Sequence, residues 1–160
     1  MLPDKDRSYT SKARFLDELA VFYGGRAAEE IFLGPDAITT GASSDIQRAT
    51  QIARSMVTEF GFDEELGAQN FVDERAEGNY LGIETTQKVV SQHTQEIIDK
   101  KVTLLLKDAY EKAREIILNH KDLHEKIANV LIEKEEMIEE EFDAFFLDVP
   151  NVPVKEKSTL

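Results

Sequence analysis

Apolar side chains recur at three- and four-residue spacing over most of this chain, and the longest such stretch covers residues 85–119. This spacing places them on one side of an α-helix, whereas a half-buried strand would show strict alternation. Similar stretches cover residues 11–33, 45–60, 122–133 and 139–146. The chain is therefore predicted to be mainly α. The apolar side of the longest stretch consists of Val89, His93, Ile97, Ile98, Val102, Leu105, Ala109, Ala113, Ile116 and Ile117.

The first predicted helix has clear ends and an unusual middle. Ser11 is a suitable N-cap, and Gly34-Pro35 ends the helix. Gly24-Gly25 in its middle costs about 1 kcal/mol per glycine relative to alanine. The pair indicates either a break between two helices or a close approach by another backbone. Close packing is favoured, because Ala27 and Ala28 keep that side of the helix small.

The second predicted helix begins near Asp45, where Ser44-Asp45-Ile46-Gln47 has the Ser-x-x-Gln form of a capping box. In this arrangement Ser44 satisfies the backbone and leaves the Asp45 carboxylate free. The residues expected on the buried side of the helix are Ile46, Ala49, Ile52, Ala53, Met56 and Val57.

Residues 67–84 show no helical period. Phe71-Val72 and Tyr80-Leu81 are separated by a polar stretch, which suggests at most one short hairpin or an edge strand near residues 70–82. In the helix at 122–133 the apolar positions are Leu123, Ile127, Val130 and Leu131. Residues 147–160 contain two prolines and a polar end, and are expected to form a disordered tail.

Composition limits the function classes. The chain of 160 residues is long enough for one domain with a core, and its net charge of −13 argues against a nucleic-acid surface and against adhesion to an anionic membrane. Without cysteine it has no disulfide and no thiolate nucleophile or ligand. No apolar run is long enough to span a bilayer, so this segment is expected to be soluble, with no direct membrane insertion.

Asp45 is the main candidate for chemistry. An acidic residue in the first turn of a helix is stabilised by the macrodipole by roughly 0.3–1 kcal/mol, and this effect alone explains an aspartate there. A carboxylate is also a good zinc ligand beside two imidazoles, at about 2.0–2.2 Å. A helix start is a rigid place from which to present it.

The histidines give weaker signals. His120 and His124 have the i, i+4 spacing of a zinc-binding helix, but the position after His120 holds Lys121, where a zinc peptidase needs its general-base glutamate. The segment also looks like a junction between helices. His93 lies on an apolar stripe and is expected to be a core histidine.

Glu29 and Glu30 are adjacent, and adjacent side chains on a helix point about 100° apart. They are therefore not expected to act on one substrate atom. One of them could orient a neighbouring ligand while the other faces solvent. No phosphate-binding loop, Ser–His–Asp set or dinucleotide motif is present, so no cofactor-binding residue is predicted.

Several ordered motifs resemble the C-terminal part of the peptidase domain of FtsH, the membrane-anchored AAA+ zinc protease, over nearly all of residues 2–146. Ile83 departs from the family, where many relatives have a basic residue. The resemblance rests on Leu2-Pro3-Asp4-Lys5-Asp6-Arg7, Leu16-Asp17-Glu18-Leu19, Tyr23-Gly24-Gly25-Arg26-Ala27-Ala28-Glu29-Glu30, Thr39-Thr40-Gly41-Ala42-Ser43-Ser44-Asp45-Ile46, Phe60-Gly61-Phe62, Glu65-Leu66-Gly67 and Tyr80-Leu81-Gly82.

The resemblance implies that residues 1–146 form the C-terminal part of a zinc metallopeptidase domain with the helical-bundle fold of the FtsH type. Asp45 would be the third zinc ligand, beside two histidines of a His-Glu-x-x-His helix that this sequence lacks. No catalytic residue is expected within the segment, because the general-base glutamate and the ATP-binding module would lie upstream. The segment alone is therefore expected to be inactive.

The resemblance also implies partners and a place in the cell. The parent would be anchored in a membrane, with its peptidase domain on the cytoplasmic, matrix or stromal side. It would degrade unfolded or membrane proteins as a homo- or hetero-hexamer, with the helices of residues 85–146 building the ring. The alternative is a non-catalytic helical oligomerisation or interaction module, or a degenerate pseudo-protease.

Overall fold

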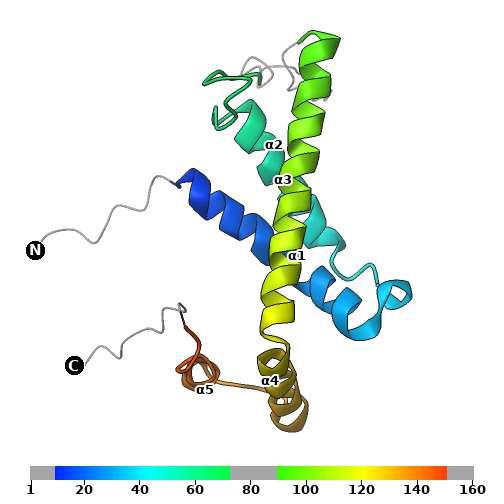
Figure 1. Cartoon of the computed structure of the whole chain (residues 1–160), viewed down its shortest axis with the longest axis vertical. Coiled ribbons are helices and arrows are strands. Elements are labelled where there is room, and N and C mark those ends of the chain that lie inside the picture. The colour runs from blue at the N-terminus through cyan, green and yellow to red at the C-terminus, as the bar shows by residue number, and fades with distance from the viewer. Residues whose placement is uncertain (1–9, 73–89, 151–160) are drawn as a thin grey trace, which may run out of the picture. The chain divides into compact units, whose positions relative to one another are not determined.

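The structure is a computed structural model that describes residues 10–72 and 90–150 (Figure 1). Helices dominate these residues, and no sheet forms among them, so the prediction of a mainly α fold is confirmed. The elements are α1 (Lys12–Leu33), the 3-10 helix η1 (Pro35–Ala37), α2 (Ser43–Thr58), α3 (Gln92–Asn119), α4 (Lys121–Lys134) and α5 (Glu139–Ala144).

The region of the predicted hairpin is described only in part. Phe71-Val72 lies within the described residues, whereas Tyr80-Leu81 lies outside them. The long helix α3 begins at Gln92, later than the predicted residue 85, and residues 85–89 are not described. The Ser91 hydroxyl accepts a hydrogen bond from the Thr94 N–H at 3.2 Å, which caps the helix at this point.

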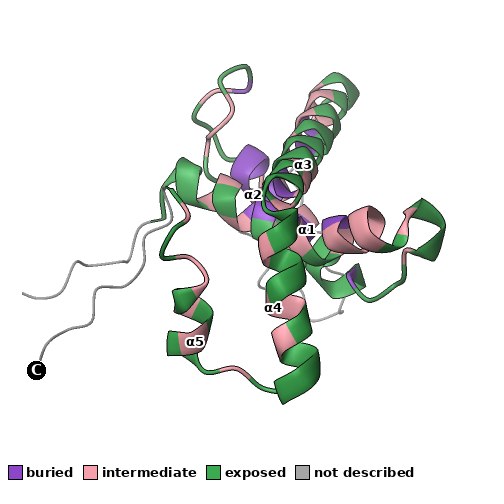
Figure 2. Ribbon diagram, turned by 60° about the horizontal axis from the view of Figure 1, so that its bottom comes forward, coloured by how far each residue is buried: buried purple, intermediate pink, exposed green. Residues whose placement is uncertain are grey.

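The chain divides into two compact units, residues 1–115 and 116–160. In the first unit, α1 packs against α2, and Figure 1 shows both helices crossing α3. The side chains of Leu19, Met56 and Ile98, one from each helix, are the largest that are fully buried. Figure 2 shows that the buried residues lie along the facing sides of these helices. This packing holds the start of α2 beside the end of α1.

The predicted end signals of α1 are confirmed. The Ser11 hydroxyl accepts a hydrogen bond from the Arg14 N–H at 3.3 Å, and Gly34 closes the helix with a φ of 90°, which favours glycine. The middle of the helix differs from the prediction. The helix is unbroken at Gly24 and Gly25, and a Cβ added at either would meet no described atom within 4 Å. The favoured close packing there is therefore wrong, because α2 and α3 cover the other side of α1.

The buried side of α2 largely follows the predicted spacing. Ala49, Ala53, Met56 and Val57 are all buried, whereas Ile46 remains 36% exposed. The helix ends in an aromatic cluster in which the ring of Phe60 stacks on that of Phe15 of α1 at 5.3 Å.

The turn after this helix depends on Gly61, which has a φ of 63°. A Cβ at this position would lie 2.9 Å from the Cα of Ala68. Only glycine fits this conformation without moving the neighbouring backbone.

The second unit contains the end of α3, followed by α4 and α5. None of its described residues is buried, and Figure 2 shows only intermediate and exposed positions on α4 and α5. Phe142 and Phe146 contact each other at 5.0 Å, and Lys134 pairs with Glu141 at 2.7 Å. Within the predicted tail, residues 147–150 form turns, and residues 151–160 lie outside the described part of the chain.

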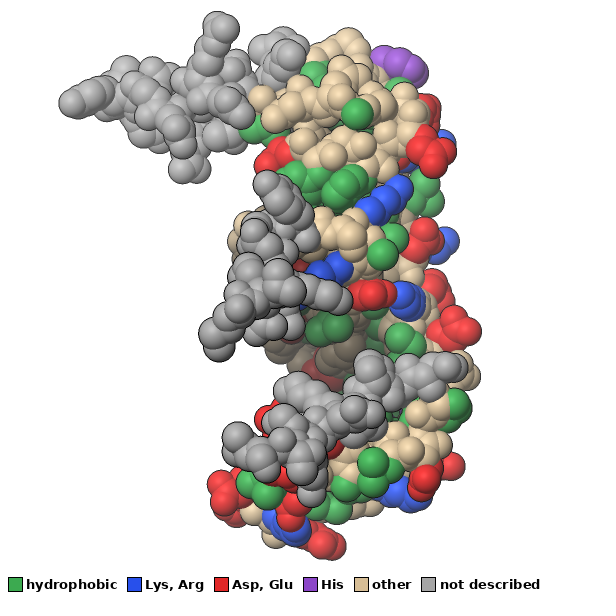
Figure 3. All heavy atoms as spheres, turned by 90° about the vertical axis from the view of Figure 1, so that its left-hand side faces the viewer, with side chains coloured by type: hydrophobic (Ala, Val, Ile, Leu, Met, Phe, Trp, Pro, Cys, Tyr) green, Lys and Arg blue, Asp and Glu red, His purple; other side chains and the backbone are tan. Residues whose placement is uncertain are grey.

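No helix in the described ranges is both long and apolar enough to cross a membrane. On the face drawn in Figure 3, Lys and Arg side chains lie among Asp and Glu side chains, in keeping with the net charge of −13.

Candidate functional site

Asp45 lies in the first turn of α2 and is exposed. Its carboxylate forms no hydrogen bond or ion pair with another described residue. The predicted capping box at Ser44 is wrong, because α2 begins earlier, at Ser43, and its N-cap is Ala42, which has no side-chain acceptor. The start of α2 is instead held by backbone hydrogen bonds, from the Ser43 N–H to the Thr40 carbonyl and from the Ile46 N–H to the Ala42 carbonyl, both at 3.0 Å.

The loop before Asp45 is tied to α1 by Glu29. One carboxylate oxygen of Glu29 accepts the Thr39 hydroxyl at 2.6 Å, and the other accepts the Thr39 N–H at 3.2 Å. The Thr39 hydroxyl oxygen in turn accepts the Gly41 N–H at 3.1 Å. These contacts hold the pKa of Glu29 below its ordinary value, through the Thr39 hydroxyl first and then the Thr39 N–H, with a further contribution from the charge of Arg26. Glu29 therefore stays ionised and fixes the loop that leads into α2.

Glu30 points to a different partner. Its carboxylate accepts a hydrogen bond from the Tyr110 hydroxyl on α3 and lies 3.6 Å from Nε of Arg114. Burial and the neighbouring Glu30 raise the pKa of Tyr110 to about 12. The two carboxylates diverge, as their adjacent positions predict. Both have partners among the described residues, and the contacts of Glu29 lie at the exposed surface.

The three histidines do not lie in one metal site. His93 is exposed near the start of α3, so its prediction as a core histidine is wrong, because the buried side of α3 begins at Ile98. His120 is the N-cap of α4 and His124 lies in the first turn of that helix, which confirms the predicted helix junction. Among the described residues no group of three or more His, Cys, Asp or Glu side chains could hold a metal ion. Asp45 fits zinc as one ligand, and two further ligands would have to come from elsewhere.

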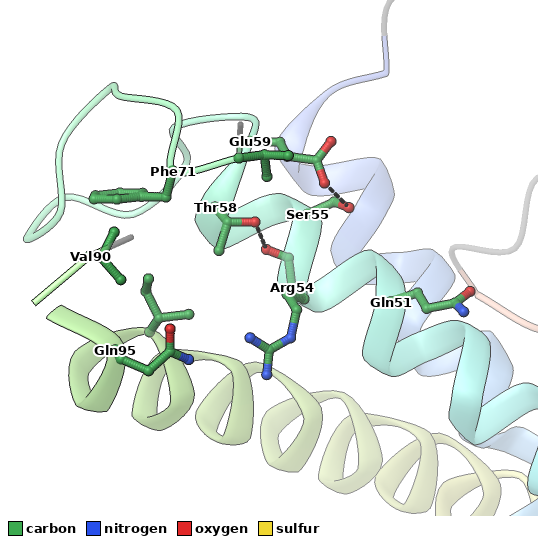
Figure 4. Close-up of a pocket in the computed structure, with 10 residues that line it drawn as sticks. Gln51, Arg54, Ser55, Thr58, Glu59, Phe71, Val90 and Gln95 are labelled. Carbon is green, nitrogen blue, oxygen red and sulfur yellow. Dashed lines mark hydrogen bonds between the residues drawn. The ribbon is translucent and has the colours of Figure 1, made fainter. Parts of the chain in front are cut away.

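A cavity of about 390 Å³ lies between α2 and the start of α3 (Figure 4). Arg54 extends across it and pairs with Asp99 of α3 at 3.1 Å, while Ser55 donates a hydrogen bond to Glu59 at 2.7 Å. Asp45 does not line this cavity. The lining residues are Gln51, Arg54, Ser55, Thr58, Glu59, Phe71, Val72, Val90, Gln95 and Ile98.

Thr39 and Tyr110 are site residues that the sequence did not reveal. The signal for Thr39 was present, because a threonine two residues before a glycine can accept that glycine's N–H in a turn. Tyr110 had no such signal, since its contact with Glu30 spans 80 residues of sequence.

Comparison with known families settles the relationship of this chain. The model of peptidase family M41 matches residues 1–145. The chain belongs to peptidase family M41. This match covers Asp45, the loop before it and all five described α-helices.

The M41 relatives include ATP-dependent zinc metalloproteases of bacteria and humans. The chain is 38% identical to FtsH of Cupriavidus metallidurans over 95% of its own length and 44% identical to FtsH of Slackia heliotrinireducens over 89%. It is 40% identical to human YME1L1 over 82% of its own length. The chain spans 23%, 18% and 15% of the length of these three relatives, respectively.

Proposed function

We propose that this chain is the C-terminal part of the peptidase domain of an ATP-dependent zinc metalloendopeptidase, to which Asp45 contributes one zinc ligand. The observation that carries the proposal is the exposed carboxylate of Asp45, without a partner among the described residues, at the start of a helix whose preceding loop is tied down. The helix macrodipole favours an acidic residue at this place without any hydrogen bond, so the carboxylate oxygens remain available to a metal ion.

The residues around Asp45 position it. Glu29 holds Thr39, Thr39 holds Gly41, and the buried side of α2 fixes the helix axis, so the carboxylate is presented from a rigid base. When bound, the zinc ion would polarise the scissile carbonyl and lower the pKa of a bound water. Glu29 itself is engaged by Thr39 and is not a free ligand.

The relatives supply the wider proposal. Their names specify an ATP-dependent zinc metalloprotease, and this chain covers less than a quarter of their length. We therefore place the other two zinc ligands, the general base and the ATP-hydrolysing module in other parts of the parent protein. The parent would be a membrane-anchored hexamer that degrades unfolded or membrane proteins, with α3, α4 and α5 contributing to the ring. The chain by itself would have no proteolytic activity.

The test is Asp45→Asn in the complete protease. The substitution keeps the size of the side chain and removes its negative charge, so proteolysis of an unfolded protein and zinc content should both fall, proteolysis by about 100-fold or more. ATP hydrolysis should persist. Asp36→Asn is the matched control, because Asp36 is an exposed aspartate in the same loop region.

Unchanged proteolysis and zinc content in Asp45→Asn would reduce Asp45 to a helix-start residue and refute the assignment. A complete protein that binds no zinc and degrades nothing before any substitution would favour the alternative, a non-catalytic helical module or pseudo-protease.

A further inference from the structure

The guanidinium group of Arg48 on α2 lies over the aromatic ring of Phe22 on α1, with its Cζ atom 5.6 Å from the ring centroid. Phe22 is half-buried and Arg48 is exposed, while the next residue, Ala49, is fully buried. Arg48 therefore lies at the edge of the contact between the two helices, and its side chain reaches across to α1. The ring attracts the guanidinium group and leaves its N–H donors in water, so this contact is favourable.

Asp45 is the carboxylate that Arg48 would ordinarily bind. The two residues are three positions apart in α2, so their side chains leave the same side of the helix with Cβ atoms about 5–6 Å apart. An acidic residue one turn before a basic one is also the favourable order for a helical ion pair. Yet no ion pair joins them, and Arg48 pairs with no other carboxylate in the part of the chain that the structure describes.

An ion pair between Arg48 and Asp45 would oppose a metal ion at Asp45 in two ways. The guanidinium N–H donors would occupy the carboxylate oxygens, and the positive charge of Arg48 would repel a dication there. With Arg48 over the ring of Phe22, the oxygens stay free. An exposed cation–π contact and an exposed helical ion pair are of similar strength, so removal of the ring is enough to shift Arg48 towards Asp45.

We propose that Phe22 is a positioning residue, whose ring holds Arg48 away from Asp45 and so keeps the Asp45 carboxylate open to the zinc ion. This role rests on the proposed function, because it affects proteolysis only where Asp45 binds zinc. The contact between Phe22 and Arg48 is measurable without any metal, so the positioning role and the zinc assignment can fail separately.

The first measurement uses NMR on the metal-free 160-residue chain. In the unmodified chain the ring current of Phe22 should shift the side-chain signals of Arg48 upfield. Phe22→Leu keeps most of the apolar bulk but removes the ring, so this shift should vanish and nuclear Overhauser effects between Arg48 and the Asp45 β-protons should strengthen. Phe22→Tyr keeps the ring and should match the unmodified chain.

Circular dichroism of each variant establishes that it is folded. Two results would overturn the proposal at this stage. One is the absence of an upfield shift in the unmodified chain, and the other is a folded Phe22→Leu in which Arg48 comes no closer to Asp45.

The second measurement determines the zinc affinity of the complete protease by competition with a chelator. Phe22→Leu should bind zinc about two- to tenfold more weakly, because Arg48 then competes for the carboxylate and repels the ion. The double variant Phe22→Leu, Arg48→Gln should recover the affinity of the unmodified protein, since the competing cation is gone. A purely structural role of Phe22 predicts the same loss in the single and the double variant.

Asp45→Asn separates the two proposals. Where Asp45→Asn loses zinc, an unchanged affinity in Phe22→Leu, or an equal loss in the single and double variants, refutes the positioning role alone. Where Asp45→Asn keeps its zinc, the proposed function fails, and the NMR measurement then decides whether Phe22 holds Arg48 away from Asp45.

Discussion

The Glu29 carboxylate accepts hydrogen bonds from both the hydroxyl and the backbone N–H of Thr39, at 2.6 and 3.2 Å. These bonds connect α1 to a loop residue ten positions further along the chain, six residues before Asp45. Because the Thr39 hydroxyl oxygen also accepts the Gly41 N–H, a single carboxylate fixes the route of the backbone into α2. The first turn of α2 has no side-chain cap, and the loop before it is held by these hydrogen bonds instead.

Removal of this connection should loosen the start of α2. Thr39→Val keeps the shape of the side chain but removes the hydroxyl, so the Gly41 N–H loses its acceptor and Glu29 keeps only one bond. Amide hydrogen exchange at Gly41 and Ser43 should accelerate by roughly an order of magnitude, with no change at Ala53 in the core of α2. Measurement by NMR at neutral pH checks this.

Thr40→Val serves as the control for this substitution, because only the backbone carbonyl of Thr40 takes part in the described hydrogen bonds. Equal acceleration in both variants would show that the loop is not held through the Thr39 hydroxyl.

The same connection should depend on pH. The pKa of Glu29 lies below its ordinary value of 4.5, chiefly because of the Thr39 hydroxyl. A carboxyl with a lowered pKa in the folded state contributes stability above its unfolded pKa, and this contribution is lost as the pH falls through the folded value. An NMR titration should therefore show Glu29 titrating below 4.5 in the unmodified chain and nearer 4.5 in Thr39→Val. A pKa that the substitution leaves unchanged would contradict the assigned cause.

Tyr110 should give an effect at the opposite end of the pH scale. Its pKa is raised from 10.0 to about 12, first by burial and then by Glu30, so the folded state holds the proton more tightly than the unfolded state does. Stability from this group is full below pH 10 and is lost as the pH rises towards about 12. Tyr110→Phe should cost about 1 kcal/mol at neutral pH and should flatten this alkaline loss. Urea unfolding at pH 7 and pH 11 measures both effects, and a loss of equal steepness in the variant would exclude Tyr110 as its source.

The local parts of the fold could be predicted from sequence because their causes are local. The Ser11 cap, the glycine end of α1 and the spacing of Ala49, Ala53 and Met56 each depend on residues within one or two helical turns. The mainly α class follows from the same periodicity.

The errors arise where a distant residue decides the outcome. Ser44 has the spacing of a cap, yet α2 begins one residue earlier, at Ser43. The loop before it is held by the contact between Glu29 and Thr39, and a contact between residues ten positions apart leaves no local pattern in the sequence. Gly24 and Gly25 suggested close packing, but which side of α1 is covered depends on where α2 and α3 lie. The contact between Glu30 and the Tyr110 hydroxyl was equally invisible, because it spans 80 residues of sequence.

Core and surface positions should differ sharply in their effect on stability. Met56 on α2 is only 1% exposed, so Met56→Ala should lower the free energy of unfolding by about 2–5 kcal/mol. Ile132 on α4 is 78% exposed, so Ile132→Ala should change it by less than about 0.5 kcal/mol. Urea unfolding followed by circular dichroism compares the two. A large loss in Ile132→Ala would mean that α4 is covered in solution, for example by a second copy of the chain.

Zinc binding by the 160-residue chain should be negligible. Asp45 supplies one carboxylate, whereas zinc sites in proteins use three or four protein ligands, and the described residues contain no group of three or more candidate ligands. A titration by calorimetry in a non-chelating buffer should therefore show no tight stoichiometric site. A tight site would contradict this prediction. The double variant His120→Ala, His124→Ala would then decide its location: loss of binding would place zinc at the start of α4, and retained binding that Asp45→Asn abolishes would place it at the start of α2.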